Sequence, residues 1–500
     1  MNAPLRRAGV VIMVLFGLLF ANLNYVQAYK ADDYRNNEHN ARVQAAEYAR
    51  QRGSIEIGRG VVLAESKATS DELKYLRTYP PNSPYAHIVG YRPVQIGPAG
   101  IEKLENDWLS GNADAQVADR WLGLLTGENT AGGIVQLTLS QKAQETAVTQ
   151  LANNANRSQK GAVVALDPRT GALLAAVSMP GFDPNPLASH NTAAAQKEYQ
   201  RLNADPAKPL LNRAFQETYP PGSTFKVIDS AVALSNGLTP DTMVTGGDTY
   251  NPPDTTHVIK NATGEDCQSQ LSLLDALTIS CNTAFARLCV EQLGSKKISD
   301  MAKAFGFTTV PKFDHDDKNA LGVVSSETGQ LTNSSGQDDK PTLAQSCIGQ
   351  SNVRMTPLQG ALIAATVANN GRQMRPYIVD KELGADRTTV NFTAAPHELA
   401  QPISGQVAAS LQQMMMSVVQ RGTATKAQIR GFDVGGKTGT AQAGDQVGEH
   451  GWFIGFAMKD GQPLVAVAVF LANAGRGGSL EASRIGGEIM KAVIAERGSK

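Results

Sequence analysis

The sequence lacks the motifs of metal-dependent and nucleotide-dependent enzymes. Its 500 residues contain no H-E-x-x-H pair, no Walker phosphate loop and no dinucleotide-binding glycine fingerprint. Cysteine is scarce, with four residues at positions 267, 281, 289 and 347, and they form neither a C-x-x-C pair nor a zinc-ligand spacing. We therefore expect chemistry that uses no metal and no other cofactor.

The chain also lacks an excess of charge of either sign. Its 46 lysines and arginines balance 46 aspartates and glutamates. This balance gives no indication of a nucleic-acid partner. The length predicts two or more domains and enough chain for a large hydrophobic core.

One long uncharged run lies near the N-terminus. Residues 8–26, "AGVVIMVLFGLLFANLNYV", approach the ~20 residues that a helix needs to cross a bilayer. Two arginines in the leader, residues 1–7, predict that the leader stays in the cytoplasm and that the rest is exported. A cleaved signal peptide is the alternative, because Val26-Gln27-Ala28 resembles a cleavage site. The run is long for a signal peptide, so we expect a single-pass anchor in the cell membrane.

The chain after the anchor divides into two regions. Residues 30–155 mix charged and turn-rich stretches without a catalytic constellation. From Gly161 two apolar runs flank the turn 168–171, which predicts a β-hairpin. Helical patterns follow from Ser223 to about Phe305.

The C-terminal third predicts further strands. A polar segment, residues 315–340, predicts an exposed loop. Strand-like runs begin at residues 434, 451 and 464, and a final helix covers about 482–495. Strands at both ends with helices between them predict an α/β fold of the α+β type, in which one antiparallel sheet is covered by helices.

The segment "YPPGSTFK", residues 219–226, places Ser223 three residues before Lys226. Two prolines stiffen the approach and a glycine permits a sharp turn. The following residues are helical in pattern, so the serine and the lysine share one face. The lysine is then either the general base of the serine or a solvated lysine near an N-cap serine, and these four residues alone do not distinguish the two.

Two later motifs favour the first interpretation. Ser280-Cys281-Asn282 lies in "TISCNTAF", and Lys437-Thr438-Gly439-Thr440 lies in "VGGKTGTAQ". Serine-x-x-lysine, serine-x-asparagine and lysine-threonine-glycine in this order are the signatures of the penicillin-binding, serine-reactive transpeptidases, and the chain resembles that family. Another serine-x-asparagine at 189–191 precedes the first motif and is excluded by chain order.

The resemblance covers nearly the whole chain. Residues 160–495 resemble the penicillin-binding transpeptidase domain, and residues 30–155 resemble the N-terminal pedestal of class B penicillin-binding proteins, a dimerisation or interaction domain. The short leader and the cysteine inside serine-x-asparagine most resemble the actinobacterial penicillin-binding protein A group. In the pedestal, Ile57-Gly58 stands where many relatives have Asp-Arg, which affects the expected packing and not the chemistry.

The resemblance implies a serine acyl-enzyme on D-Ala-D-Ala donors. Ser223 would attack, and Lys226 would accept its proton if burial and a nearby cation, Lys437, keep it neutral. Ser280 would relay a proton to the departing D-alanine, and Asn282 would bond the peptide amide.

The same resemblance assigns the remaining contacts to the third motif. Thr438 and Thr440, with Gly439 between them, would hold the terminal carboxylate of the donor. The backbone N–H groups of Ser223 and Thr440 would form the oxyanion hole.

The implied function is peptidoglycan D,D-transpeptidation during growth or division, with covalent inhibition by β-lactams. The partners would be stem peptides and, through the pedestal, a RodA/FtsW-like glycan polymerase. A D,D-carboxypeptidase or β-lactamase, a β-lactam-binding sensor and an inactive scaffold are the alternatives. The long pedestal and the anchor disfavour the hydrolases, the single span disfavours the sensor, and the complete set of reactive residues disfavours the scaffold.

Cys281 lies inside the second motif, between two residues expected to face the cleft. Export makes a disulfide plausible. Cys281 and Cys289 are expected on one helix, where eight residues rise about 12 Å, too far for a bridge. These constraints favour a Cys267–Cys281 disulfide, with four buried thiols as the alternative.

Overall fold

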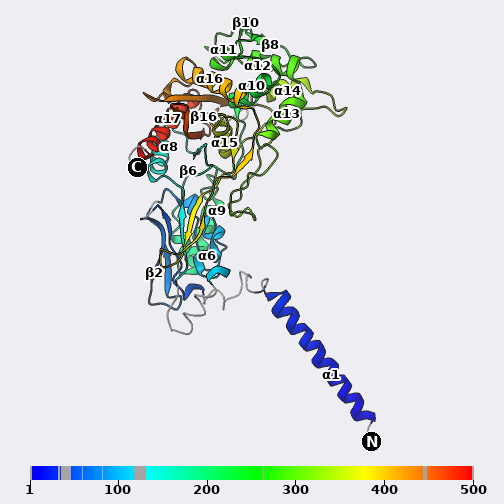
Figure 1. Ribbon diagram of the computed structural model, residues 1–500, viewed down its shortest axis with the longest axis vertical. Coiled ribbons are helices and arrows are strands. Elements are labelled where there is room, and N and C mark those ends of the chain that lie inside the picture. Colours follow the sequence, from blue (N-terminus) through cyan, green and yellow to red (C-terminus); the bar gives the residue numbers. More distant parts are fainter. Residues whose placement is uncertain are drawn as a thin grey trace.

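The computed structural model describes residues 3–31, 34, 47–58, 60–81, 83–116, 131–262, 264–442 and 448–497. Parts of the predicted leader and of the predicted pedestal lie outside these residues. The described chain forms two lobes, with helix α1 (Ala3–Asn24) projecting away from both (Figure 1). Within the described residues, one helical stretch, Arg6–Tyr29, is long and apolar enough to cross a membrane, with a mean hydropathy of 2.0 and no buried residue.

The upper lobe of Figure 1 is built on a five-stranded sheet in the order β15-β16-β17-β5-β6. All neighbours are antiparallel. The strands are β5 (Gly161–Leu166), β6 (Leu173–Met179), β15 (Asp433–Ala441), β16 (His450–Lys459) and β17 (Gln462–Leu471). The predicted antiparallel sheet, made from a hairpin at the start of the domain and three strands near its end, is confirmed.

Helices cover both faces of this sheet. A glycine of α15 (Pro357–Ala368) packs against Ile454, and a glycine of α17 (Gly478–Arg497) packs against Phe453. Ile454 and Phe453 are neighbours on β16, so their side chains point to opposite faces. The sheet is therefore the middle layer of the lobe.

Helix α8 (Gln141–Ala152) packs against α17 and β6. The other helices of this lobe are the 3₁₀ turn η4 (Gly222–Phe225), α10 (Lys226–Ser235), α11 (Leu273–Thr278), α12 (Asn282–Leu288), the π-helix η5 (Cys289–Leu293), α13 (Ser295–Ala304), α14 (Lys340–Ser346) and α16 (Gly405–Arg421). Helix α9 (Thr192–Ala204) lies in the lower lobe (Figure 1). Two-stranded ribbons join β7 (Met243–Thr245) to β10 (Gln270–Ser272) and β11 (Gln373–Met374) to β14 (Glu398–Ala400).

The polar segment 315–340 is less exposed than its composition predicts. Leu321, Val323 and Leu331 are buried in the main hydrophobic core. An isolated bridge also pairs Glu327 with Arg354. The prediction of an exposed loop is therefore wrong for these positions, because a few apolar residues anchor an otherwise polar segment.

The lower lobe contains a six-stranded sheet in the order β13-β12-β4-β1-β2-β3. Its strands are β1 (Ile55–Ile57), β2 (Val61–Ala68), β3 (Tyr75–Thr78), β4 (Ile134–Leu137), β12 (Val379–Leu383) and β13 (Val390–Thr393). β12 and β13 follow α15 in the chain. β12 pairs with β4, and β13 pairs with β12. The sheet thus joins the N-terminal region to a segment that lies more than 200 residues later.

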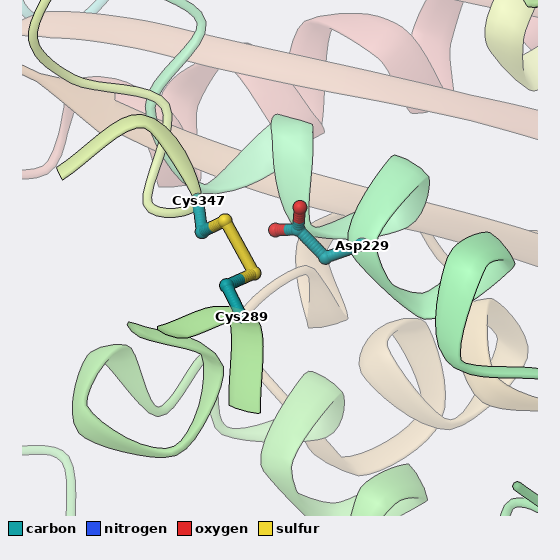
Figure 2. Close-up of side chains that lie close together, drawn as sticks. All are labelled: Asp229, Cys289 and Cys347. Atoms are coloured by element: carbon teal, nitrogen blue, oxygen red, sulfur yellow. A yellow bond between two sulfur atoms is a disulfide. The ribbon is translucent and has the colours of Figure 1, made fainter. Parts of the chain in front are cut away.

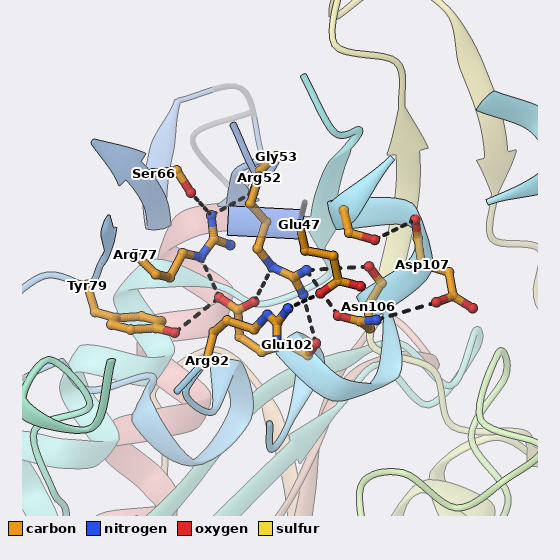
Figure 3. A network of polar contacts seen from close by, with 11 residues as sticks. Glu47, Arg52, Gly53, Ser66, Arg77, Tyr79, Arg92, Glu102, Asn106 and Asp107 are labelled. Carbon is orange, nitrogen blue, oxygen red and sulfur yellow. Dashed lines mark hydrogen bonds and ion pairs between the residues drawn. The ribbon is translucent and has the colours of Figure 1, made fainter. Parts of the chain in front are cut away.

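A buried ion network stabilises this lobe (Figure 3). The carboxylate of Glu102, on α5 (Ile101–Leu104), accepts from Arg52 Nε at 2.7 Å and from Arg77 Nε at 2.6 Å. Tyr79 donates its hydroxyl to the same carboxylate at 3.2 Å. Burial raises the pKa of Glu102, but the two arginines outweigh burial and lower it to about 2. The network ties α5 to β3 and to the segment that precedes β1.

The departure at Ile57-Gly58 is accommodated locally. The Ile57 side chain is buried in the core, and Gly58 takes a positive φ of 54° in the turn between β1 and β2. The amide of Gln136 donates to the Gly58 carbonyl at 2.9 Å.

Candidate active site

The three sequence motifs converge on one cluster of side chains. Lys226 begins α10, Asn282 begins α12 and Lys437 lies in β15. Lys226 Nζ donates to Asn282 Oδ1 at 2.7 Å and lies 3.3 Å from Ser280 Oγ. Lys437 Nζ donates to the same Ser280 Oγ at 2.8 Å. Ser280 therefore bridges two lysines that are 211 positions apart.

Both lysines are fully buried. Burial lowers the pKa of Lys226 to about 8, although Glu265 and Asp229 act in the opposite direction. Burial and then the charge of Lys226 lower the pKa of Lys437 well below its usual range. Since a base must be neutral to accept a proton, these shifts suit Lys226 to that role near neutral pH.

Ser223 lies in η4, the 3₁₀ turn directly before α10. It is partly exposed, whereas both lysines are inaccessible. Within the described residues, no hydrogen bond joins the Ser223 hydroxyl to Lys226, whose Nζ is held by the second motif. Ser223 and Asn282 are therefore the partly exposed members of the cluster.

Two glycines let the turn that holds Ser223 touch β15. Gly222 has a φ of +54°, and a Cβ there would lie 2.4 Å from the Thr440 carbonyl oxygen. A Cβ on Gly439 would lie 2.5 Å from the Pro221 carbonyl oxygen. This contact brings the backbones of Ser223 and Thr440 onto adjacent segments, as a shared oxyanion hole requires.

The two threonines of the third motif have hydroxyl neighbours that the sequence did not reveal. Thr438 is buried, and its Oγ1 lies 2.5 Å from Thr423 Oγ1. Thr440 is exposed, and its Oγ1 donates to Ser479 Oγ at 3.2 Å. Thr423 and Ser479 are thus further hydroxyls next to the predicted carboxylate contacts.

Ser280 has an unusual backbone conformation. Its φ is +69°, a left-handed value that costs an L-residue roughly 1–2 kcal/mol. The residue stands between α11 and α12, and its N–H donates to the Leu277 carbonyl. This conformation places the Ser280 hydroxyl between the two lysines.

Two disulfides hold the helix that begins with Asn282. The structure joins Cys267 to Cys281, the pair favoured from the sequence, with 5.7 Å between the Cα atoms. It also joins Cys289 to Cys347, at 6.5 Å, a pair that the sequence left unassigned. Cys281 is the N-cap of α12 and Cys289 follows its last residue, so α12 is crosslinked at both ends.

Asp229 lies beside the second disulfide (Figure 2). Its side chain is fully buried, and neither carboxyl oxygen has a hydrogen-bond partner among the described residues. Burial raises its pKa well above the usual range, which favours the protonated carboxyl. The sulfur atoms of Cys289 and Cys347 are bonded to each other, so this group is not a metal site. The only signal of Asp229 in the sequence is an acid within an apolar helix, so its position beside the site is not predictable from the sequence.

His450 and Trp452 pack beneath the first motif. Trp452 Nε1 donates to the Pro220 carbonyl at 2.9 Å and so fixes the approach to Ser223. His450 packs its ring against Tyr219, and burial lowers its pKa to about 4. The packing and the lowered pKa indicate a structural role for His450.

Comparison with known families decides the assignment. Residues 161–494 match the penicillin binding protein transpeptidase domain, and residues 52–135 match the penicillin binding protein A dimerisation domain. The chain belongs to the penicillin-binding protein transpeptidase family. All three motifs of the cluster fall within the matched transpeptidase domain.

Individual relatives cover almost all of the chain. It is 40% identical over 500 residues to the peptidoglycan D,D-transpeptidase PbpA of Mycolicibacterium smegmatis and 38% identical over 504 residues to that of Mycobacterium tuberculosis, with 99% of each chain covered in both comparisons. The ceftriaxone acyl-enzyme of M. tuberculosis penicillin-binding protein A superimposes with a TM-score of 0.83 at 37% identity, covering 90% of this chain and 100% of that one. A D,D-transpeptidase domain from Eggerthella lenta superimposes with a TM-score of 0.76 at 31% identity, covering 90% and 100%.

Proposed function

We propose that this protein is a peptidoglycan D,D-transpeptidase that crosslinks stem peptides through an acyl-enzyme on Ser223. The observation that supports this most strongly is the pair of buried lysines that meet on Ser280 beside a partly exposed serine. This arrangement supplies a base, a proton relay and a second amine that holds the relay, without a histidine.

Acylation begins with attack of Ser223 Oγ on the carbonyl carbon of the penultimate D-alanine. The hydroxyl proton passes to neutral Lys226, and the carbonyl oxygen becomes an oxyanion held by the N–H groups of Ser223 and Thr440. As the C–N bond breaks, Ser280 passes a proton to the departing D-alanine amine. The serine ester that remains is the acyl-enzyme.

Deacylation reverses the proton path. The amine of an acceptor stem peptide attacks the ester carbonyl and loses a proton to the same base. Ser223 Oγ leaves with that proton, and the new amide is the crosslink. Lys437 donates from Nζ to Ser280 Oγ and so holds the relay hydroxyl in place in both steps.

The third motif and Asn282 recognise the donor peptide. Thr438 and Thr440 hold the terminal carboxylate, and the absent side chain of Gly439 allows β15 to pack against the turn that holds Ser223. Asn282 Nδ2 donates to the Lys260 carbonyl at 3.0 Å, which orients the side chain. The remaining hydrogen-bonding groups of the Asn282 amide bond the peptide amide of the donor.

The proposed placement is a single-pass anchor with the N-terminus in the cytoplasm and both lobes outside. Residues 1–7 are the leader, 8–26 the anchor, 30–155 the pedestal and 160–495 the transpeptidase domain. The pedestal carries none of the three motifs and is proposed to contact a RodA/FtsW-like polymerase whose glycan strands this enzyme crosslinks. Site-specific photocrosslinking in cells from exposed residues of β2 should capture that polymerase, and its absence from the products would refute the partner.

The reaction itself is tested with a donor peptide and a separate amine acceptor. The full chain should form the crosslinked amide faster than it releases the hydrolysed donor acid. Release of acid alone, with normal labelling by fluorescent penicillin, would instead identify a D,D-carboxypeptidase. Labelling without either product would identify a β-lactam sensor.

A further inference from the structure

A second group of ionisable side chains lies where the two lobes meet. Glu105 lies between α5 and α6 (Asn106–Ser110), His315 lies in the polar segment 315–340, and Glu382 lies in β12. Their ligand atoms all lie within 4.8 Å of one another. His315 Nδ1 is 3.9 Å from Glu105 Oε1 and 3.7 Å from Glu382 Oε1.

The group is short of positive charge. The side chain of Glu105 is 5% exposed, and its Oε1, the atom that faces His315, has no hydrogen-bond partner among the described residues. Asp107 and Asp316 add negative charge around it. Within the same part of the chain, the ion pairs of Glu105 and Glu382 are with His315 alone. Two buried carboxylates side by side therefore need a shared proton or a cation.

The surroundings hold two of the three side chains in place. The amide of Asn391 donates to the second oxygen of Glu382, which leaves Oε1 facing His315. The ring of Phe392 packs on the His315 ring, with 3.9 Å between centroids. Such outer contacts orient the ligands of metal sites.

We propose that Glu105, His315 and Glu382 bind a zinc ion. Two carboxylate oxygens and one imidazole nitrogen suit Zn²⁺, whereas Ca²⁺ and Mg²⁺ prefer sites made only of oxygen. Tetrahedral Zn²⁺ with bonds of about 2.1 Å separates its ligands by roughly 3.4 Å. The two distances from His315 Nδ1, 3.9 and 3.7 Å, therefore need to shorten by a few tenths of an ångström. The His315 side chain is 34% exposed, which leaves an entry path and room for water as the fourth ligand.

The proposed ion has a structural role. It joins the N-terminal lobe, the polar segment of the transpeptidase lobe and a strand that links the two. None of its ligands belongs to the three catalytic motifs, so zinc is expected to stabilise the junction and to leave the acylation of Ser223 unchanged.

The test uses the full chain in detergent, stripped of metal with a chelator and titrated with Zn²⁺. Bound zinc is counted by elemental mass spectrometry, and the melting temperature is recorded at each step. We expect one zinc per chain and a higher melting temperature with zinc. Glu105→Gln and His315→Ala should each weaken zinc binding at least tenfold. His397→Ala is the matched control, because His397 is an exposed histidine that contacts Asp314 outside the group.

Penicillin labelling of each variant shows whether it is folded, so a loss of zinc cannot be mistaken for unfolding. Zinc uptake that is equal in the wild type and in both variants would overturn the proposal. No uptake by the wild type, with Glu105→Gln more stable than the wild type, would show that the carboxyls share a proton instead. Binding of Mn²⁺ or Ca²⁺ in place of Zn²⁺ would overturn the choice of ion.

Discussion

At the scale of single residues, the chemistry depends on which buried groups carry charge. The three motifs were visible in the sequence because each combines rare residue types at a fixed spacing. Asp229, Thr423 and the bond from Trp452 to Pro220 were not, since each contributes through one tertiary contact that leaves no pattern in the chain.

The lowered pKa of Lys226 predicts how acylation depends on pH. Since the neutral amine is the base, the rate of penicillin acylation should rise with pH and level off above about 8. Lys226→Arg should slow acylation by about 10²-fold or more at every pH, because arginine keeps its proton. Stopped-flow measurement with a chromogenic β-lactam gives the profile. Lys296→Arg, at an exposed site, is the control, and a wild-type rate that is flat between pH 6 and 9 would rule out Lys226 as the base.

At the scale of helices and strands, the transpeptidase lobe was largely predictable. The expected strands begin within one or two residues of β15, β16 and β17. For β16 and β17 the reason is a long apolar run that ends at turn residues. The six-stranded sheet was not predictable, since β12 pairs with β4 across more than 200 residues and no local signal announces that pairing.

Because the Ser223 turn touches β15, adding one carbon atom at Gly222 should lower the free energy of unfolding. Gly222→Ala must place its Cβ against the Thr440 backbone at a positive φ, so it should destabilise the protein by about 2–4 kcal/mol and slow acylation. Gly461→Ala has a similar φ of +72° but open space around it, and should cost about 1 kcal/mol with normal acylation. Denaturant unfolding and penicillin labelling measure both effects. Equal behaviour of the two variants would refute the close contact.

The two disulfides should contribute unequally to stability. Cys289 and Cys347 are 58 positions apart and close a longer loop than Cys267 and Cys281, which are 14 apart. Loop entropy predicts losses of about 4 and about 3 kcal/mol when each pair is replaced by alanine. Replacement of Cys267 and Cys281 should slow acylation more than replacement of the other pair, because Cys281 separates Ser280 from Asn282. Thiol counting on the unreduced protein is the first check, and a free thiol at any of the four positions would contradict the pairing.

At the scale of the whole molecule, the two lobes are stabilised differently. The transpeptidase lobe has an apolar sheet between helices, whereas the N-terminal lobe also contains the buried network around Glu102. The sequence indicated both regions by resemblance. It did not indicate that strands β12 and β13 complete the sheet of the N-terminal lobe.

The Glu102 network predicts a loss of stability in acid. The pKa of Glu102 is lowered to about 2 in the folded protein from 4.5, so its contribution is complete above pH 4.5 and is lost as the pH falls toward 2. The difference corresponds to about 3 kcal/mol. Glu102→Gln should unfold more readily at pH 7 and should show a smaller loss of stability between pH 5 and 3. An unchanged acid profile in this variant would mean that other carboxyl groups dominate.

Ser223 is the residue on which we expect the acyl group. Mass spectrometry of the full chain in membranes treated with penicillin, followed by peptide mapping, tests this assignment, with folded Ser223→Ala as the comparison. We expect one acyl group per chain, on the peptide that contains Ser223, and none on the variant. An acyl group on another residue, or on a folded Ser223→Ala protein, would contradict it.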